Sequence, residues 1–534
     1  MALQKCLAEC KTLKDGPPKS YQLMLKRENL DRLSDKESKL RRFTYGKQNP
    51  KYPNKTILVV GATGTGKSTL INAMVNYVMG VKFETNAWIE MIVDNSDRAQ
   101  SESQTSEISV YEVFGFEGET VDFSLTVIDT PGYGDTRGIH YDDIVTKKLQ
   151  DLFCLPNGVK VIDAVGLVIK ASENRLDERM CYIFNSVTSL FGKDMEDNIV
   201  VMFTFSDGCE PTTAIQAVKD AGIKCAMKDG DPIYFLFNNR QRDKRDGKKG
   251  AIKAAKTAFE TSQDGLEEFT EFLKKTKPQS MDSTVTVMTK RIRLTACIQN
   301  IQERVNEVEM KEKEIKNHRG AVNKYAEEIK KNSNYKMTVD EVYKVKVPIG
   351  NRWWDWYAVT CSRCEENCHN PGCTMAWDAS WCWVMKDRHC TSCTGKCHDS
   401  VHVRDNFTYE SRTRQVQKTK ADIKKIYDDI KKKRDKEVSL VESMEEELEE
   451  LKKKKNNLLE EAYQIIIKLE EIALNADSVS TLMHLDYLIE KMKERNDQTK
   501  LQKLEEMKKR VHKHNQAGFK FFNVMKNAFS KLWN

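Results

Sequence analysis

One short segment near the start of the chain restricts the possible folds more than any other part of the sequence. Residues 61–68 read Gly-Ala-Thr-Gly-Thr-Gly-Lys-Ser, directly after the apolar run Thr56–Val60 and directly before a helical stretch. This glycine spacing lets backbone N–H groups point inward around phosphate oxygens, and the following helix N-terminus adds positive potential. A strand, this loop and a helix in that order predict an α/β domain with a phosphate-binding loop.

Further apolar runs bounded by turn residues follow and alternate with helical stretches. They are Ser124–Ile128, Ala164–Ile169, Asn198–Phe203 and Ile233–Phe237. Short runs of this kind are typical of buried strands in a mostly parallel sheet with crossover helices. We therefore expect an α/β P-loop domain over residues 54–278.

Before it, leucines at helical spacing (residues 23, 30, 33 and 40) predict a basic, helical lead-in over residues 1–53.

The loop and a later strand end predict contacts to phosphate and Mg²⁺. Lys67 is expected to reach the β- and γ-phosphates, and Ser68 to ligate Mg²⁺. Asp129, in the run Asp-Thr-Pro-Gly, is expected to hold the same ion through water, and Gly132 to sense the γ-phosphate. The expected contacts of the loop are Gly61, Ala62, Thr63, Gly64, Thr65, Gly66, Lys67, Ser68 and Thr69.

A hydroxyl between these motifs is expected to close over Mg²⁺ and the γ-phosphate. The segment Ser101–Ser106 is polar and precedes a strand. We prefer Thr105 for this role, and Ser103 and Ser106 are the alternatives. Lys67, Thr105 and Gly132 are then the candidate catalytic groups.

Two further strand ends carry residues suited to a purine base. The run Thr204-Phe-Ser-Asp207 follows one apolar strand, and Asn238 and Asn239 follow another. A carboxylate at Asp207 can accept hydrogen bonds from the guanine N1 and N2 groups. Phe205 stands where the Asn/Thr-Lys-x-Asp pattern has a lysine, so ring stacking is expected to replace the lysine stem. Together the two strand ends favour guanine over adenine.

A different pattern begins after the P-loop domain. Apolar residues follow a 4-3 spacing over 294–329 and again over 441–472, in segments rich in Lys and Glu. This pattern indicates a coiled coil or long helical hairpin, and the alternative is a helix packed on its own globular domain. The expected boundaries are 284–335 for the first arm, 336–409 for an insert with short strands, 410–475 for the second arm and 476–534 for C-terminal helices.

The insert contains eight of the 15 cysteines. The chain has no apolar segment of membrane-spanning length and its start lacks a signal-peptide core, so we expect a reducing compartment, where clustered thiols bind metal more often than they form disulfides. Eight thiols match two tetrahedral zinc sites, with a histidine able to displace one cysteine, and the pairing stays open. A redox sensor and an open catalytic zinc are the weaker alternatives. The candidate ligands are Cys361, Cys364, Cys368, Cys373, Cys382, Cys390, Cys393, Cys397, His369, His398 and His402.

Six tryptophans lie in the same region, and they form either the core of the insert or an exposed contact surface. They are Trp353, Trp354, Trp356, Trp377, Trp381 and Trp383.

The charge balance argues against a dedicated nucleic-acid binder, because the net charge is only +7 over 534 residues. The positive charge gathers at the ends: residues 1–53 carry 13 basic and 6 acidic side chains, and residues 503–534 carry 8 and 2. The segment Gly518–Trp533 is amphipathic and basic. It is expected either to dock on the protein or to lie on a membrane surface.

These motifs, in this order, resemble those of the GTPases of immunity-associated proteins and of the septins, which are P-loop GTPases. The matching runs are residues 61–72, Thr105, residues 129–135, 204–207 and 237–240. Residues 174–192 also resemble the box that the immunity-associated family has between its third and fourth motifs. The resemblance covers about residues 55–275, and the helical region with its cysteines looks similar to that of large animal GTPases.

The resemblance implies GTP/GDP and Mg²⁺ as cofactors and a homodimer or oligomer formed through the G domain, often on membranes. Small GTPases place a Gln after the Asp-x-x-Gly motif, whereas residues 133–136 read Tyr-Gly-Asp-Thr here. We therefore expect GTP hydrolysis that is slow or completed by a partner subunit, with Arg137 and His140 as candidates. Zn²⁺ is a further expected cofactor, and the expected location is cytoplasmic or peripheral to a membrane.

Two other functions stay open. One is a non-catalytic scaffold that binds GTP for stability and uses the coiled coil and zinc tip for interaction. The other is an ATPase of the zinc-hook type, which is disfavoured because all nucleotide motifs of this chain precede the coiled coil.

Overall fold

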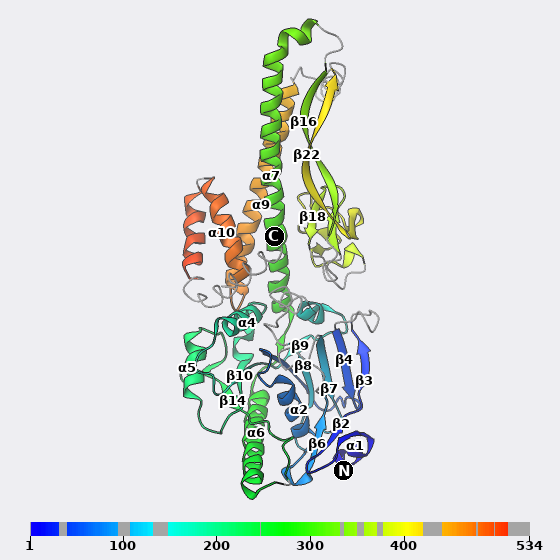
Figure 1. Ribbon diagram of the computed structural model, residues 1–534, viewed down its shortest axis with the longest axis vertical. Coiled ribbons are helices and arrows are strands. Elements are labelled where there is room, and N and C mark those ends of the chain that lie inside the picture. The colour runs from blue at the N-terminus through cyan, green and yellow to red at the C-terminus, as the bar shows by residue number, and fades with distance from the viewer. Residues whose placement is uncertain are drawn as a thin grey trace. The chain divides into compact units, whose positions relative to one another are not determined.

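A computed structural model describes most of the chain (Figure 1). The described residues are 2–30, 40–93, 107–131, 148–245, 247–331, 336–349, 357–370, 378–419, 440–476, 479–495 and 497–510. The chain folds as two compact units. Unit 1 comprises residues 1–288, 470–483 and 505–534, and unit 2 comprises residues 289–469 and 484–504.

An eight-stranded sheet lies at the centre of unit 1, in the order β14-β11-β10-β5-β8-β7-β4-β3. Its neighbours are parallel except for β8/β7 and β4/β3, which are antiparallel. The strands are β3 (Lys26–Asn29), β4 (Leu40–Tyr45), β5 (Asn54–Gly61), β7 (Ile108–Val113), β8 (Ser124–Asp129), β10 (Ala164–Lys170), β11 (Ile199–Thr204) and β14 (Tyr234–Leu236). The five predicted strands are confirmed as β5, β8, β10, β11 and β14, and the mostly parallel α/β fold is confirmed with them.

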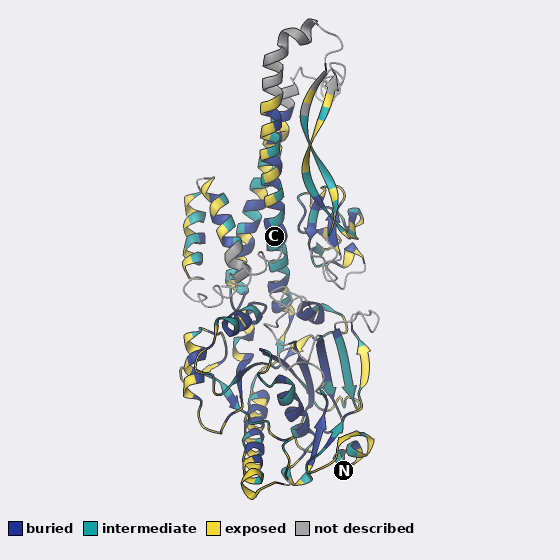
Figure 2. Ribbon diagram, in the orientation of Figure 1, coloured by how far each residue is buried: buried dark blue, intermediate teal, exposed yellow. Residues whose placement is uncertain are grey.

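The central strands are buried almost along their whole length (Figure 2). Successive side chains of a strand point to opposite faces of the sheet. Accordingly, Ile57 and Val59 of β5 belong to one buried cluster, and Leu58 and Val60 belong to another. Helices complete both clusters, which explains why β5 is apolar without alternation. Helices α2 (Lys67–Val78) and α6 (Lys249–Lys275) contribute to the cluster that contains Ile57 and Val59. Helices α4 (Glu178–Thr188) and α5 (Thr212–Asp220) contribute to the cluster that contains Leu58 and Val60.

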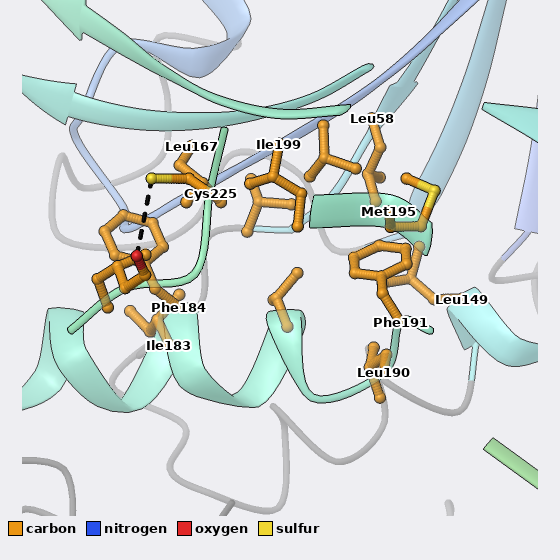
Figure 3. Close-up of a cluster of buried hydrophobic side chains, with 14 of the residues drawn as sticks. Leu58, Leu149, Leu167, Ile183, Phe184, Leu190, Phe191, Met195, Ile199 and Cys225 are labelled. Carbon is orange, nitrogen blue, oxygen red and sulfur yellow. Dashed lines mark hydrogen bonds between the residues drawn. The ribbon is translucent and has the colours of Figure 1, made fainter. Parts of the chain in front are cut away.

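One of these clusters is drawn in Figure 3. Ile183 and Phe184 of α4 and Leu190 and Phe191 of the following turn extend toward the sheet. They meet strand side chains that include Leu58, Leu167 and Ile199. This packing places α4, and with it the segment before it, firmly against β5 and β10.

The predicted helical lead-in over residues 1–53 is wrong beyond its first turns. Among the described residues of this segment, 2–30 and 40–53, α1 (Ala2–Glu9) is the only helix, and β1 to β4 follow it. β3 and β4 extend the main sheet, so the boundary at residue 54 is wrong as well. Leu23, Leu30 and Leu40 are buried at strand ends rather than along a helix face.

The remaining short elements of unit 1 lie around the main sheet. β1 (Lys11–Lys14), β2 (Lys19–Gln22) and β6 (Ala87–Glu90) form a three-stranded sheet. The others are η1 (Phe83–Thr85), β9 (Val161–Ile162), η2 (Lys193–Asn198), β12 (Met227–Lys228), β13 (Asp231–Pro232) and β15 (Gln279–Ser280).

Long helices and a long ribbon build much of unit 2. The helix α7 (Asp282–Lys331) starts in unit 1 and continues into unit 2, where α9 (Leu440–Ile472) packs against it. Val308 and Ile315 of α7 share a buried cluster with Met444 and Leu448 of α9. These positions belong to the predicted 4-3 spacing. Helix α10 (Val479–Lys493) and a helical segment at 498–510 follow.

The second helical arm is wrong at its start, because residues 407–419 form a strand. β16 (Lys336–Pro348) and β22 (Phe407–Thr419) pair antiparallel over 13 register positions. Phe407, Tyr409, Thr413 and Val416 lie in this strand. Such residues favour strands.

The Cys-rich insert is a small module that lies between the two strands of this ribbon along the chain. Its three-stranded sheet has the order β18-β17-β21. Arg304 of α7 forms buried ion pairs with Glu307 and with Glu366 of the insert, and Glu366 also accepts the backbone N–H of Thr394 at 2.6 Å. The elements are β17 (Ala358–Cys361), β18 (Glu366–His369), η3 (Ala379–Trp381), β19 (Met385–Lys386), β20 (His389–Cys390), η4 (Asp399–Val401) and β21 (His402–Asp405).

Several expectations fall outside the described residues. They concern the amphipathic segment Gly518–Trp533, the tryptophans 353, 354, 356 and 377, and Leu33. Within the described part of the chain, no helix is both long and apolar enough to span a membrane.

A close approach between α6 and β14 gives a stability prediction. A Cβ at Gly265 would lie 2.1 Å from the backbone oxygen of Leu236, whereas one at Gly250 of the same helix meets nothing within 4 Å. We expect Gly265→Ala to destabilise unit 1 by about 1–3 kcal/mol, because a strand carbonyl cannot move away. Gly250→Ala is the matched control and should be neutral or stabilising by up to about 1 kcal/mol. Thermal unfolding followed by circular dichroism compares them, and equal melting temperatures would contradict the packing.

Candidate functional site

The phosphate-binding loop joins β5 to α2 with the backbone that the glycine pattern predicts. Gly66 is the N-cap of α2 and has a φ of 87°, in the left-handed region that favours glycine. A Cβ at Gly61 would lie 2.7 Å from the backbone oxygen of Val168, so the strand end also requires glycine. Thr65 closes the turn by donating its hydroxyl to the oxygen of Ala62 at 2.9 Å.

Lys67 lies folded over this loop. Its Nζ donates to the backbone oxygens of Gly61 at 2.9 Å and of Ala62 at 3.1 Å. Burial lowers the pKa of Lys67 to about 8, and the negative charge of Asp129 opposes this shift. The ammonium is thus held at the mouth of the loop by neutral carbonyls, which a phosphate can replace with a stronger, charged partner.

Asp129 ends β8 directly beside the loop. In the parallel pairing of β5 and β8 it stands opposite Val59, and it is fully buried. The next residue, Thr130, donates its hydroxyl to the backbone oxygen of Val59 at 2.9 Å, which ties the two strand ends together. Ser68, the first hydroxyl of α2, is partly exposed. An Mg²⁺ site built on Ser68 and Asp129 therefore has its donors on adjacent elements.

The end of β11 is bonded directly to the phosphate-binding loop. Thr204 donates its hydroxyl to the backbone oxygen of Thr65 at 2.7 Å. Phe205 follows with a φ of 54°, and a Cβ placed on Gly66 would lie 3.5 Å from its ring. The ring is 60% exposed and covers the loop from the side of the base motif. Stacking of a base on this ring stays a prediction.

Asp207 and Asn239 reach the same edge of the sheet, because β11 and β14 are adjacent and parallel. Asp207 is exposed, and its Oδ1 accepts the backbone N–H of Cys209 at 2.9 Å, which orients the carboxylate. Ser262 of α6 accepts the N–H of Asn238 at 2.9 Å and donates to Asn239 Oδ1 at 3.0 Å. Asn239 Nδ2 is buried without a hydrogen-bond partner among the described residues. A buried N–H group of this kind can donate a hydrogen bond to an acceptor atom of a bound ligand.

Several predicted site residues lie outside the described part of the chain. They are Ser103, Thr105, Ser106, Gly132, Arg137 and His140. The other nucleotide-site residues are brought together as predicted, on the ends of β5, β8, β11 and β14.

Two asparagines of α2 also hold the helix in place through hydrogen bonds to the backbone, and they were not predicted from the sequence. Asn72 Oδ1 accepts the N–H groups of Met91 and Ile92 at 2.9 and 3.0 Å. Asn76 both accepts from and donates to the backbone of Ile89, at 2.9 and 2.7 Å. They fasten β6 to the helix that starts at the loop. Polar residues at i and i+4 on an otherwise apolar face were the available signal.

Two groups of metal-type ligands form in the insert, and each has ligand atoms within 4.8 Å of one another. The first comprises Cys361, Cys364, Cys393 and Cys397, and the second comprises Cys368, Cys390, Cys393 and His402. Tetrahedral zinc with bonds of about 2.3 Å to sulfur spaces its ligands about 3.8 Å apart. Cys364 Sγ and Cys397 Sγ, at 3.6 Å, fit that spacing.

Backbone N–H groups point at the sulfurs of both groups. Cys390 Sγ accepts from Ser392 and Cys393, each at 3.3 Å, and Cys393 Sγ accepts from Cys397 at 3.2 Å. Such contacts stabilise a thiolate, which is the form that binds metal. The donor set and its second layer of hydrogen bonds fit zinc.

The other predicted zinc ligands lie elsewhere. His369 Nδ1 is 3.2 Å from Cys382 Sγ, and neither belongs to either group. His398 caps η4 by accepting the N–H of Ser400 at 3.2 Å. Cys373 lies outside the described residues. The cysteines that are described form no disulfide.

Comparison with known proteins agrees with the nucleotide site. The profile of the AIG1 family matches residues 55–253. Septin-1 of Drosophila melanogaster is 38% identical over 80 residues, which cover 15% of this chain and 19% of that protein. GTP-binding protein A of Dictyostelium discoideum is 26% identical over 155 residues, 29% of each chain.

These matches are partial, since the chain spans about a fifth of the septin's length. Among solved structures, Toc33 from Arabidopsis thaliana in complex with Mg²⁺ and GMPPNP covers 42% of this chain and 88% of its own. It has a TM-score of 0.28 and 20% identity, a superposition too limited to assign a function. The family profile falls on the domain that carries the loop. Residues 55–253 therefore form a domain of the AIG1 family, a septin-like P-loop GTPase domain.

Proposed function

We propose that the chain is a guanine-nucleotide-binding protein that assembles through its P-loop domain and hydrolyses GTP slowly. One observation carries the proposal: the hydrogen bond from Thr204 to Thr65 joins the base-reading strand end to the phosphate-binding loop. The AIG1-family match supports GTP or GDP with Mg²⁺ as the ligands. Ser68 and Asp129 would hold the ion, with Thr105 added from outside the described residues.

Guanine recognition rests on Asp207 and Asn239. An ionised carboxylate only accepts hydrogen bonds. It therefore suits the two N–H donors on the Watson–Crick edge of guanine and disfavours adenine, which presents an acceptor there. Asn239 Nδ2, buried and lacking a partner among the described residues, supplies a donor for a base oxygen.

Slow or partner-completed hydrolysis follows from the sequence after Asp129. No glutamine stands in residues 130–140 to orient the attacking water. A second copy across the nucleotide would complete the site, and the helices α7 and α9 would add a coiled-coil contact. The alternative is a scaffold that binds GTP without turnover, and it is favoured by the same missing glutamine.

The insert is proposed to be a two-zinc module in which Cys393 bridges both ions. Seven side chains then give each ion four ligands, because Cys393 belongs to both groups. The zinc would hold together a module whose buried cluster consists largely of cysteines. Its role is structural, since both ligand sets are complete without water or substrate.

We also propose a cytoplasmic location, where a reducing environment keeps these thiols available for metal. Contact with a membrane surface rests on the basic segment Gly518–Trp533. Docking of that segment on the protein remains the alternative.

Nucleotide preference and turnover test the proposal directly. Purified protein should bind GTP and GDP at least about tenfold more tightly than ATP, because Asp207 pairs with guanine donors. GTP turnover per molecule should rise with protein concentration, since a second copy completes the site. Calorimetry and phosphate release measure the two quantities.

The matched variant is Asp207→Asn, which keeps the size and the turn but adds a donor. It should lose guanine preference and gain affinity for xanthine nucleotides, which present an oxygen at that edge. Preferential ATP binding by the unaltered protein would refute the guanine assignment, and zero turnover at every concentration would establish the scaffold.

The lowered pKa of Lys67 predicts a pH dependence of nucleotide affinity. The free protein has a Lys67 pKa of about 8, and a bound polyphosphate raises it because it favours the ammonium. Affinity should therefore be full below pH 8 and should fall as pH rises through 8, by roughly tenfold between pH 7 and 9. Lys67→Ala should bind weakly and lack this slope. A wild-type affinity that is constant over this range would contradict the prediction.

Removal of the shared thiolate tests the zinc module. The wild-type chain should contain about two zinc ions by elemental mass spectrometry. Cys393→Ser should lose both, because each group loses a ligand, whereas Cys382→Ser should keep both. Retention of one ion by Cys393→Ser would show separate sites, and loss of zinc by Cys382→Ser would reassign the ligands.

A further inference from the structure

Residues of unit 2, from helix α7 and the Cys-rich insert, line a cavity of about 350 Å³. Thr289 and Arg293 contribute from α7, and Trp381, Trp383 and Lys386 contribute from the insert. This volume lies at the lower end of the range for small-molecule sites. None of these residues takes part in the nucleotide site or in either group of metal-type ligands.

Positive charge gathers around this cavity. Lys290, next to Thr289 on α7, feels the charges of Arg293, Lys386 and Lys468, and these charges, together with the larger effect of burial, lower its pKa. Neither Lys290 nor Lys386 forms an ion pair within the described part of the chain. Lys290 and Lys386, which have no such ion pair and lie near further positive charge, favour an anionic ligand.

One carboxylate nearby is already shared. Glu461 of α9 accepts Arg293 at 3.0 Å and Lys396 at 2.7 Å. It can therefore neutralise only part of the local charge. Arg293 Nε is also buried without a hydrogen-bond partner among the described residues. Buried donors normally have partners, so this N–H is a position for a ligand or water oxygen.

Aromatic surface completes the cavity. Trp381 is 72% exposed, which is unusual for the largest side chain, and Trp383 packs partly against the insert's core. An indole beside unpaired cations offers a flat apolar wall for the carbon skeleton of an organic anion.

We propose that this cavity binds a small organic anion that carries phosphate groups. Arg293 and Lys386, which line the cavity, contact the phosphates, Lys290 adds positive charge beside them, and Trp381 covers the carbon skeleton. Phosphate is favoured over a single carboxylate because it carries more charge and more acceptor oxygens, which match a fork of Arg donors and two lysines. The ligand is either a free phosphorylated metabolite or the headgroup of a lipid, since both present this chemistry.

Titration of the full-length protein, saturated with GDP and Mg²⁺ so that the phosphate-binding loop is filled, tests the proposal. Inositol trisphosphate is the soluble probe, followed by calorimetry and by tryptophan fluorescence. Saturable binding with a change in fluorescence is expected. The double variant Lys290→Gln/Lys386→Gln should bind at least about tenfold more weakly, since each charged hydrogen bond contributes on that order.

Lys313→Gln is the matched control, because it removes an exposed lysine of the same helix, and it should bind like the wild type. Circular dichroism and zinc content confirm that each variant is folded. Absence of saturable binding, or equal affinity of the double variant and the wild type, would overturn the proposal.

The source of the ligand is distinguished with phosphatidylcholine vesicles, with and without phosphatidylinositol bisphosphate. Vesicle binding that requires this lipid and is lost in the double variant supports a lipid headgroup. Binding of the soluble probe without vesicle binding supports a free metabolite.

Discussion

The carboxyl end of β5 is the constraint on which the rest of unit 1 depends. β5 is buried on both faces and ends at a glycine where a Cβ would meet the backbone of β10. The chain must therefore turn away at once, and that turn is the phosphate-binding loop. β8 and β11 end beside it: the hydroxyl of Thr130 ties β8 to Val59 of β5, and the hydroxyl of Thr204 ties β11 to Thr65 of the loop. Because parallel strands end at one edge, residues far apart in the sequence converge there.

Unit 2 is stabilised differently, since its insert has little apolar core. The buried cluster of the insert contains Val359, Ala379 and Val384 beside six cysteines. Clustered thiolates are typical ligands of structural zinc, and the proposed ions would supply stability that apolar burial does not. The buried ion pairs of Arg304 with Glu307 and Glu366 then fasten the module to α7. An isolated buried charge would be costly, so these partners depend on one another.

The nucleotide site could largely be predicted from the sequence because its signals are local. Gly66, Lys67 and Asp129 each stand in a short motif at a strand end. The N-terminal strands could not be predicted, because they are short and gain their stability from β7 and β6 rather than from their own residues. The grouping of cysteines in the insert also could not be predicted, since Cys393 comes to lie in both groups of metal-type ligands only when the chain has folded. Ser262 acts through contacts to Asn238 and Asn239 that no spacing reveals.

The ribbon of β16 and β22 has a consequence for how this chain can vary in length. Its 13 paired positions lead from the helical region to the insert and back. Deleting one residue from a single strand would send every later side chain of that strand to the opposite face and tilt the insert about the ribbon axis. Homologous proteins should therefore lengthen or shorten the two strands together, so that gaps in an alignment of relatives would occur in matched pairs here.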